Sequence, residues 1–274
     1  LSQNEDFAEA IIVKSLGPTY SSIQISTYRN VFGLIPIFLF LLFSSEWKKR
    51  NYSIKIPFSW IVIIRGGLIT FAQFCFFTSL MYLEFATATT LSFATPLIVT
   101  ILSIPILGQK IGKWRWIAVF LGFSGIFMIV NPSGDLFTFY ALLPLGASFG
   151  YGMSMVLVKL YPREVPSALI QAYSQISSMC FSIIFLIFSF QYIQIQNFID
   201  LIFIVLMGLL GGSGVFLIIV SYRMTNHINL GPFEYFGILF AFSLGWLIFE
   251  ETPFDKLFPG VIFIVVSGLL ILWR

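Results

Sequence analysis

Carboxylates inside apolar segments are the residues of this chain that could bind a charged molecule or carry a proton. Glu234 is the one carboxylate well inside a complete apolar run, and Ser2, Glu5 and Glu9 share one helical face through spacings of three and four. An unpaired charge in a membrane is costly, so such groups usually face water, a partner or a ligand. We predict that Glu234 binds a small-molecule substrate. Glu5, Glu9 and Glu234 are also candidate proton-binding residues, because like charges held close in a low dielectric favour the protonated form.

A second group of candidates supplies aromatic surfaces, hydrogen bonds and freed backbone carbonyls to the same substrate. It comprises Gln73, Pro96, Tyr151, Tyr173 and Tyr235. Proline interrupts a membrane helix and leaves carbonyl groups that a ligand can use. Simpler interpretations stay open: the tyrosines and Gln73 can serve packing, and Pro96 can be a plain kink. Glu234 can cap its helix or form an ion pair, and the acidic N-terminal face can belong to a solvated leader.

Metal and enzyme chemistry find little support in the sequence. His227 is the only histidine, and the two cysteines, Cys75 and Cys180, lie in apolar runs without CxxC spacing. There is no HExxH motif and no pair of Asp residues at facing central positions of two spans. We therefore predict no metal site, no cofactor and no enzymatic activity. An intramembrane enzyme or a channel is the alternative, but the catalytic groups of the first and the polar filter of the second are not apparent.

The composition is that of an integral membrane protein. Of the 274 residues, 58% are hydrophobic and 10% are charged, whereas soluble domains are about 25% charged. The net charge of +3 is too small to indicate a nucleic-acid partner. The partner that this composition predicts is the lipid bilayer.

Apolar runs of about 20 residues, the length that crosses a bilayer, predict about ten transmembrane helices in an all-α fold. Residues 1–16 are read as the second half of a first helix whose apolar beginning is missing. The following spans are expected at about 23–43, 59–83, 87–107, 114–130, 136–158, 167–190 and 198–222, with two more between 228 and 274. Two Gly-xxx-Gly pairs, Gly146/Gly150 and Gly208/Gly212, predict close helix packing.

An internal repeat divides the chain into two halves, 1–132 and 136–274. The helical hairpin at 86–132 recurs at 228–274, about 142 residues later. The pair Val13-Lys14 and the residue Tyr28 recur as Val158-Lys159 and Tyr173, at an offset of 145. Each half contains five predicted spans, and an odd number requires the second half to enter the membrane from the opposite side. The sequence therefore predicts two inverted five-helix repeats.

The distribution of charge supports this inversion and sets an orientation. The turn at 108–113 is basic, whereas the equivalent turn at 250–256 is mostly acidic. Because Lys and Arg gather in cytoplasmic loops, both termini are predicted to be cytoplasmic, in the plasma (inner) membrane. This assignment counts Arg65 with the cytoplasmic basic residues and Arg29 with the few external ones.

Over essentially its whole length, the chain resembles the EamA branch of the drug/metabolite transporter superfamily. The resemblance rests on 65–67 through 82–83, on 86–96 followed by 108–109, and on 231–235 through 245–246 to 249–253. It implies a secondary transporter that moves a small organic metabolite by alternating access around a cavity between the halves. Members of the family carry amino acids, vitamins, nucleosides and adenosyl compounds.

Two positions depart from the family pattern. The first-half turn usually carries Gly-Glu, but here it reads Gly108-Gln109, and the glutamate is kept only in the second half as Glu251. The first helix usually has an acidic residue four positions before its lysine, whereas Glu9 precedes Lys14 by five.

Overall fold

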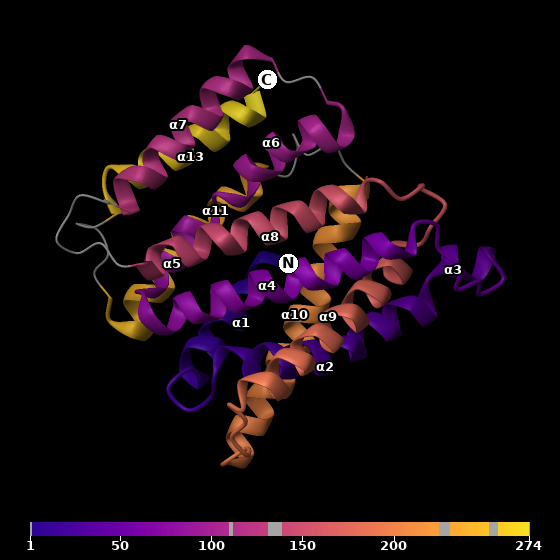
Figure 1. Cartoon of the computed structure of the whole chain (residues 1–274). Helices are drawn as coiled ribbons and strands as arrows, with labels where there is room; N and C mark the ends of the chain where they lie inside the picture. Colours follow the sequence, from indigo (N-terminus) through magenta and orange to yellow (C-terminus); the bar gives the residue numbers. More distant parts are fainter. Residues whose placement is uncertain (1, 110–111, 131–138, 225–230, 252–256, 274) are drawn as a thin grey trace.

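The computed structural model describes residues 2–109, 112–130, 139–224, 231–251 and 257–273 (Figure 1). For residues 2–6, 222, 231–239 and 271–273 it describes the backbone alone. Every regular element in this described part is helical. The elements are α1 (Ser2–Leu16), α2 (Ser22–Phe43), α3 (Ser45–Lys49), α4 (Ser59–Tyr82), α5 (Phe85–Ser92), α6 (Thr95–Leu107), α7 (Lys113–Val130), η1 (Phe139–Leu142), α8 (Leu143–Val158), α9 (Ser167–Ser189), α10 (Phe198–Met224), α11 (Gly231–Phe249) and α13 (Gly260–Trp273).

Seven segments within the described residues are long and apolar enough to cross a membrane. They are 22–43, 59–82, 85–107, 113–130, 139–158, 167–189 and 198–221. Shorter apolar stretches, Phe240–Phe249 and Gly260–Leu270, lie in α11 and α13. The seven spans predicted between residues 23 and 222 begin and end within three residues of these segments.

Local signals explain where several helices begin and end. The hydroxyl of Ser21 accepts the N–H of Gln24 at 3.3 Å and caps the start of α2. Gly108 ends α6 with a φ of +65°, a conformation that glycine adopts without strain. The helix break between α5 and α6 falls just before Pro96, which occupies the first turn of α6.

One helix of each sequence half packs against two helices of the other half. Helix α10 packs against α1 and α2 of the first half, and α4 packs against α8 and α9 of the second half. Helices α2 and α9 join these two sets, and α7 lies beside α13 at the edge of the molecule (Figure 1). We call the sets the α1–α2–α10 group and the α4–α8–α9 group.

Glycines permit several of these close contacts, as the Gly-xxx-Gly spacing predicted. A Cβ atom added to Gly212 would lie 2.4 Å from the carbonyl oxygen of Gly33, and one added to Gly208 would lie 2.4 Å from Cβ of Phe32. Gly150 is similarly tight, because its Cβ would lie 2.8 Å from the carbonyl oxygen of Leu68. Close packing is confirmed at Gly150, Gly208 and Gly212, whereas a Cβ atom at Gly146 would make only an ordinary contact, 3.4 Å from Sγ of Cys75.

Loop contacts gather at the two opposite ends of the bundle. At one end, Tyr161 donates to the carbonyl of Phe58 at 2.9 Å, and Arg223 donates to that of Pro162 at 2.7 Å. At the other end, Tyr20 donates to Asp200 at 2.8 Å. The connections before α4 and after α8 therefore share one end, and those after α1 and α9 share the other.

Candidate functional site

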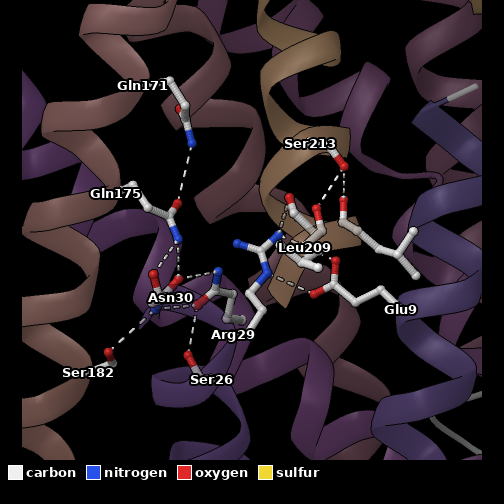
Figure 2. Close-up of polar contacts among 12 residues, drawn as sticks. Glu9, Ser26, Arg29, Asn30, Gln171, Gln175, Ser182, Leu209 and Ser213 are labelled. Carbon is white, nitrogen blue, oxygen red and sulfur yellow. Dashed lines mark hydrogen bonds and ion pairs between the residues drawn. The ribbon is translucent and has the colours of Figure 1, made fainter. Parts of the chain in front are cut away.

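Three amide side chains meet at the contact between α2, α4 and α9. Gln73 Nε2 donates to Asn30 Oδ1 at 3.1 Å, Asn30 Nδ2 donates to Gln73 Oε1 at 2.9 Å, and Gln175 Nε2 donates to Asn30 Oδ1 at 3.1 Å. All three residues are fully buried, and Figure 2 shows Asn30 and Gln175 pointing toward one another from neighbouring helices. We call them the central amide cluster. It joins the two packing groups by hydrogen bonds without placing a charge between them.

Serine hydroxyls complete the hydrogen bonding of this cluster. Ser26 donates to Gln73 Oε1 at 2.7 Å, and Asn30 Nδ2 lies 3.4 Å from Ser182 Oγ. Buried polar groups inside a membrane bundle require such partners. The polar atoms of Gln73 are thus engaged within the protein, which favours an interhelical role for this residue over direct contact with a substrate.

A buried ion pair lies beside the cluster, within the α1–α2–α10 group. Arg29 Nε donates to Glu9 Oε1 at 2.8 Å, and Arg29 Nη2 donates to the carbonyl oxygen of Gly211 at 3.1 Å (Figure 2). The side chains of Arg29 and Glu9 are only 3% and 8% exposed. Arg29 is therefore an internal residue that holds three helices together. The prediction that it belongs to the external basic residues was wrong.

A second buried arginine occupies the α4–α8–α9 group. Arg65 is fully buried; its Nε donates to the carbonyl of Ser154 at 3.0 Å, and its Nη1 donates to Oγ of Ser174. The prediction that Arg65 belongs to the cytoplasmic basic residues was also wrong, because its guanidinium is buried among helices. Among the described residues it has no carboxylate partner.

An interhelical ion pair lies at the end of the bundle that carries the connections after α1 and α4. Lys14 binds the carboxylate of Glu251 and donates to the carbonyl of Leu83 at 3.1 Å. The second carboxylate oxygen of Glu251 accepts the N–H of Phe85 at 2.6 Å. The pair thus ties the last turn of α1 to the α4–α5 connection and to the segment that follows α11.

The predicted site residues lie in different parts of the molecule. Gln73 belongs to the central amide cluster, whereas the hydroxyl of Tyr173 donates to the carbonyl of Ile54 at 3.0 Å, at one end of the bundle. Tyr151 is partly buried in α8. Pro96 was expected to leave a backbone carbonyl free for other partners. The carbonyl of Ser92, four residues earlier, accepts hydrogen bonds from the hydroxyls of Thr95 at 2.8 Å and Ser148 at 3.1 Å.

Three further predictions fall outside what the structure describes. The side chains of Glu5, Glu234 and Tyr235 are not among the described ones, although the backbones of these residues belong to α1 and α11. Glu9 was predicted to share an acidic face that lines a cavity. Its carboxylate is instead buried against Arg29.

Sequence reasoning missed Asn30, Gln175 and the roles of the two arginines. A signal for the first two was present, since Asn30 and Gln175 are separated by 145 residues, the offset that relates the two halves. Polar residues at equivalent positions of an internal repeat are candidates for contact across its symmetry axis. The arginines lay near the predicted ends of their spans, and for that reason they were assigned to the surface.

Comparison with known proteins identifies the family. The EamA-like transporter family matches residues 8–131 and 138–273. The chain belongs to this family. A solved crystal structure shares the fold with a TM-score of 0.67 and 15% identity, over 98% of this chain and 95% of the other.

Several relatives whose names state a function align with much of this chain. The chain is 24% identical to an S-adenosylmethionine uptake transporter of Rickettsia conorii, over all of this chain and 90% of that protein. It is 28% identical to a riboflavin transporter of Vibrio cholerae, over 63% of this chain and 57% of that protein. It is 23% identical to the pseudopaline exporter CntI of Pseudomonas aeruginosa, over 93% of this chain and 88% of that protein. The EamA-like chain described here is thus an integral membrane transporter.

Proposed function

We propose that this EamA-like transporter moves a small organic metabolite across the plasma membrane by alternating access, as two inverted five-helix repeats with both termini in the cytoplasm. The observation that carries the proposal is the contact between Asn30 and Gln175, which are equivalent positions at the repeat offset of 145. Two equivalent residues meet when they lie close to a two-fold axis. The central amide cluster would then mark the pivot of the motion.

Contacts between helices support the same symmetry. If the repeats are superposed, α1, α2 and α4 correspond to α8, α9 and α10. The contacts of α10 with α1 and α2 then correspond to the contacts of α4 with α8 and α9, and both sets are present. Close approach agrees as well. Gly33 lies against Gly208, and Gly66 lies against Ser178. Ser178 follows Gly33 by 145 residues, and Gly208 follows Gly66 by 142.

This packing supports a proposal for which bodies move. The third long helix of each repeat packs with the first two of the other repeat, so each rigid body contains elements of both repeats. We propose that the α1–α2–α10 group and the α4–α8–α9 group rock about their shared α2–α9 contact. Such rocking of one bundle against another around a central site is the usual form of alternating access.

We propose an adenosyl compound of the S-adenosylmethionine class as the substrate. The S-adenosylmethionine transporters of Rickettsia match over 96–100% of this chain, whereas the riboflavin transporters match over 63–66%. Such a substrate carries cationic groups and an aromatic base. Glu234 would bind a cationic group, and Tyr235 or Tyr151 would stack on the base or on the cation.

Uptake into proteoliposomes tests this assignment. Purified protein should accumulate radiolabelled S-adenosylmethionine above the level of protein-free liposomes, and excess unlabelled S-adenosylmethionine should compete while riboflavin competes weakly. The same ligand should raise the melting temperature, since a ligand that binds only the native state stabilises it. Saturable uptake of riboflavin without uptake of S-adenosylmethionine would overturn the substrate class. No uptake and no thermal shift with S-adenosylmethionine would refute the adenosyl assignment.

A further inference from the structure

The ammonium group of Lys14 is held at a junction of three segments. It binds Glu251 and the carbonyl of Leu83, and Glu251 in turn accepts the N–H of Phe85. The side chains of Lys14 and Glu251 are only 18% and 12% exposed. Charge-assisted hydrogen bonds of this kind are about twice as strong as neutral ones, and partial burial protects them from screening by salt.

Apolar residues lie directly beneath this ion pair. Lys14 Nζ lies 4.9 Å from the centroid of the Phe249 ring, and Phe249 stacks on Phe85 with ring centroids 5.4 Å apart. Ala86 is fully buried, and a Cβ atom added to Gly245 would lie 3.5 Å from Cβ of Ala86 and 3.4 Å from Oε2 of Glu251. The ion pair therefore covers a buried layer at the end of the bundle.

We propose that the Lys14–Glu251 pair is a latch that closes the transport path at this end and breaks when the path opens there. The inference rests on the proposed function, because a path with alternating access must close at one end while it is open at the other. The contacts of the pair support it: Lys14 belongs to the first half and Glu251 to the second. The bond from Lys14 to Leu83 also joins the α1–α2–α10 group to the connection that follows α4.

In the described part of the chain, the opposite end of the path has no equivalent ion pair. The repeat relates Lys14 to Lys159 at an offset of 145, and Glu251 to Gln109 at an offset of 142. Gln109 carries no charge and is exposed, and Lys159 forms no ion pair within the described chain. Burial lowers the pKa of the Lys159 ammonium group from its ordinary value, as expected where no anion compensates desolvation. Apolar packing between α6 and α8, including Val99, Met155 and Val158, closes this end instead.

The rate of cysteine labelling at each end tests the latch. In a background without Cys75 and Cys180, Ala86→Cys reports on the end closed by the latch, and Val158→Cys reports on the other end. Both positions are fully buried. A small water-soluble thiol reagent should label each one only when its end opens. Glu251→Gln removes the charge at nearly constant size, and Glu250→Gln, at the exposed neighbouring residue, is the matched control.

Glu251→Gln should raise the labelling rate of Ala86→Cys about tenfold and lower that of Val158→Cys, because the population shifts toward the state open at the latch. Glu250→Gln should change neither rate, and the swap Lys14→Glu/Glu251→Lys should restore both rates in part. A rise at Ala86→Cys with no change at Val158→Cys would show only local loosening and would overturn the proposal. If Glu251→Gln does not fold, Lys14→Gln gives the same test from the other partner.

A reversible cross-link separates this inference from the proposed function. Lys14→Cys/Glu251→Cys, bridged by a reducible bifunctional thiol reagent, should lose uptake and regain it after reduction. Full uptake by the cross-linked protein would overturn the latch and leave the transporter assignment intact. Absence of S-adenosylmethionine uptake in the unmodified parent protein, with the labelling shifts present, would instead contradict the proposed substrate and leave the latch intact.

Discussion

Removal of the Glu9 carboxylate should destabilise the protein strongly. Glu9→Gln would keep the bond from the guanidinium of Arg29 to the carbonyl of Gly211 but would remove the carboxylate charge that pairs with it at 2.8 Å. Because both side chains are more than 90% buried, water cannot take the place of the carboxylate. Breaking a buried ion pair by removal of one partner costs about 3–5 kcal/mol, so we expect a loss of about 3 kcal/mol.

A double-mutant cycle measures this loss in detergent-solubilised protein. At about 2–4 °C per kcal/mol for a chain of this size, Glu9→Gln should lower the melting temperature by roughly 6–12 °C. Arg29→Met should cost a similar amount. The double variant should be more stable than the sum of the two single losses predicts, because residues in contact are coupled. The matched control, Glu46→Gln at an exposed position, should shift the free energy of unfolding by less than about 0.5 kcal/mol.

The reasoning fails if Glu9→Gln melts within about 2 °C of the parent protein. It fails equally if the losses of the two single variants add without coupling. Either result would mean that the pair does not hold α1, α2 and α10 together, and that Glu9 is free to serve another role such as proton binding.

Further expectations follow from helix packing, topology and the candidate carboxylates. Gly212→Ala should lower the melting temperature clearly, because its Cβ would lie 2.4 Å from a backbone oxygen, whereas Gly112→Ala, with nothing within 4 Å, should not. In intact cells, an impermeant thiol reagent should label Glu250→Cys and spare Gly112→Cys, and equal labelling would refute the inverted repeat. Glu234→Gln should fold normally and lose at least tenfold in uptake; a fully active variant would remove Glu234 from the site. If a proton drives the cycle, collapse of an imposed pH gradient should reduce uptake, and unchanged uptake would favour exchange.

The sequence predicted the helices well because membrane-spanning helices can be recognised from the length and hydrophobicity of a segment. Apolar runs at 59–83 and 198–222 became helices at Ser59–Tyr82 and Phe198–Met224. Inside a bilayer every backbone group needs a partner, and an α-helix supplies these partners within its own segment. The local sequence therefore suffices to place the helix, whatever the rest of the chain does.

The same local reasoning failed for charged residues near helix ends. Arg29 and Arg65 were read as residues at the membrane surface, since a charge near the end of a span can reach water. Both are buried because partners from distant segments receive them: Glu9 and Gly211 for Arg29, Ser154 and Ser174 for Arg65. Such partners depend on which helices are neighbours, and hydrophobicity along the chain does not contain that information.

The two arginines also show how the repeats have diverged while they kept a common packing plan. The offset of 145 relates Glu9 and Arg29 to Ser154 and Ser174, and these serines are the residues that bind Arg65. One guanidinium thus occupies each of two equivalent junctions, but it comes from α2 in one and from α4 in the other. Among the described residues, only the junction with Glu9 contains a carboxylate. If the protein alternates between two states as proposed, the two bodies would carry unequal charge, and the two ends would close unequally, at Lys14–Glu251 and at Lys159 with Gln109. This inequality would give an otherwise symmetric mechanism a physical basis for preferring one of its two states.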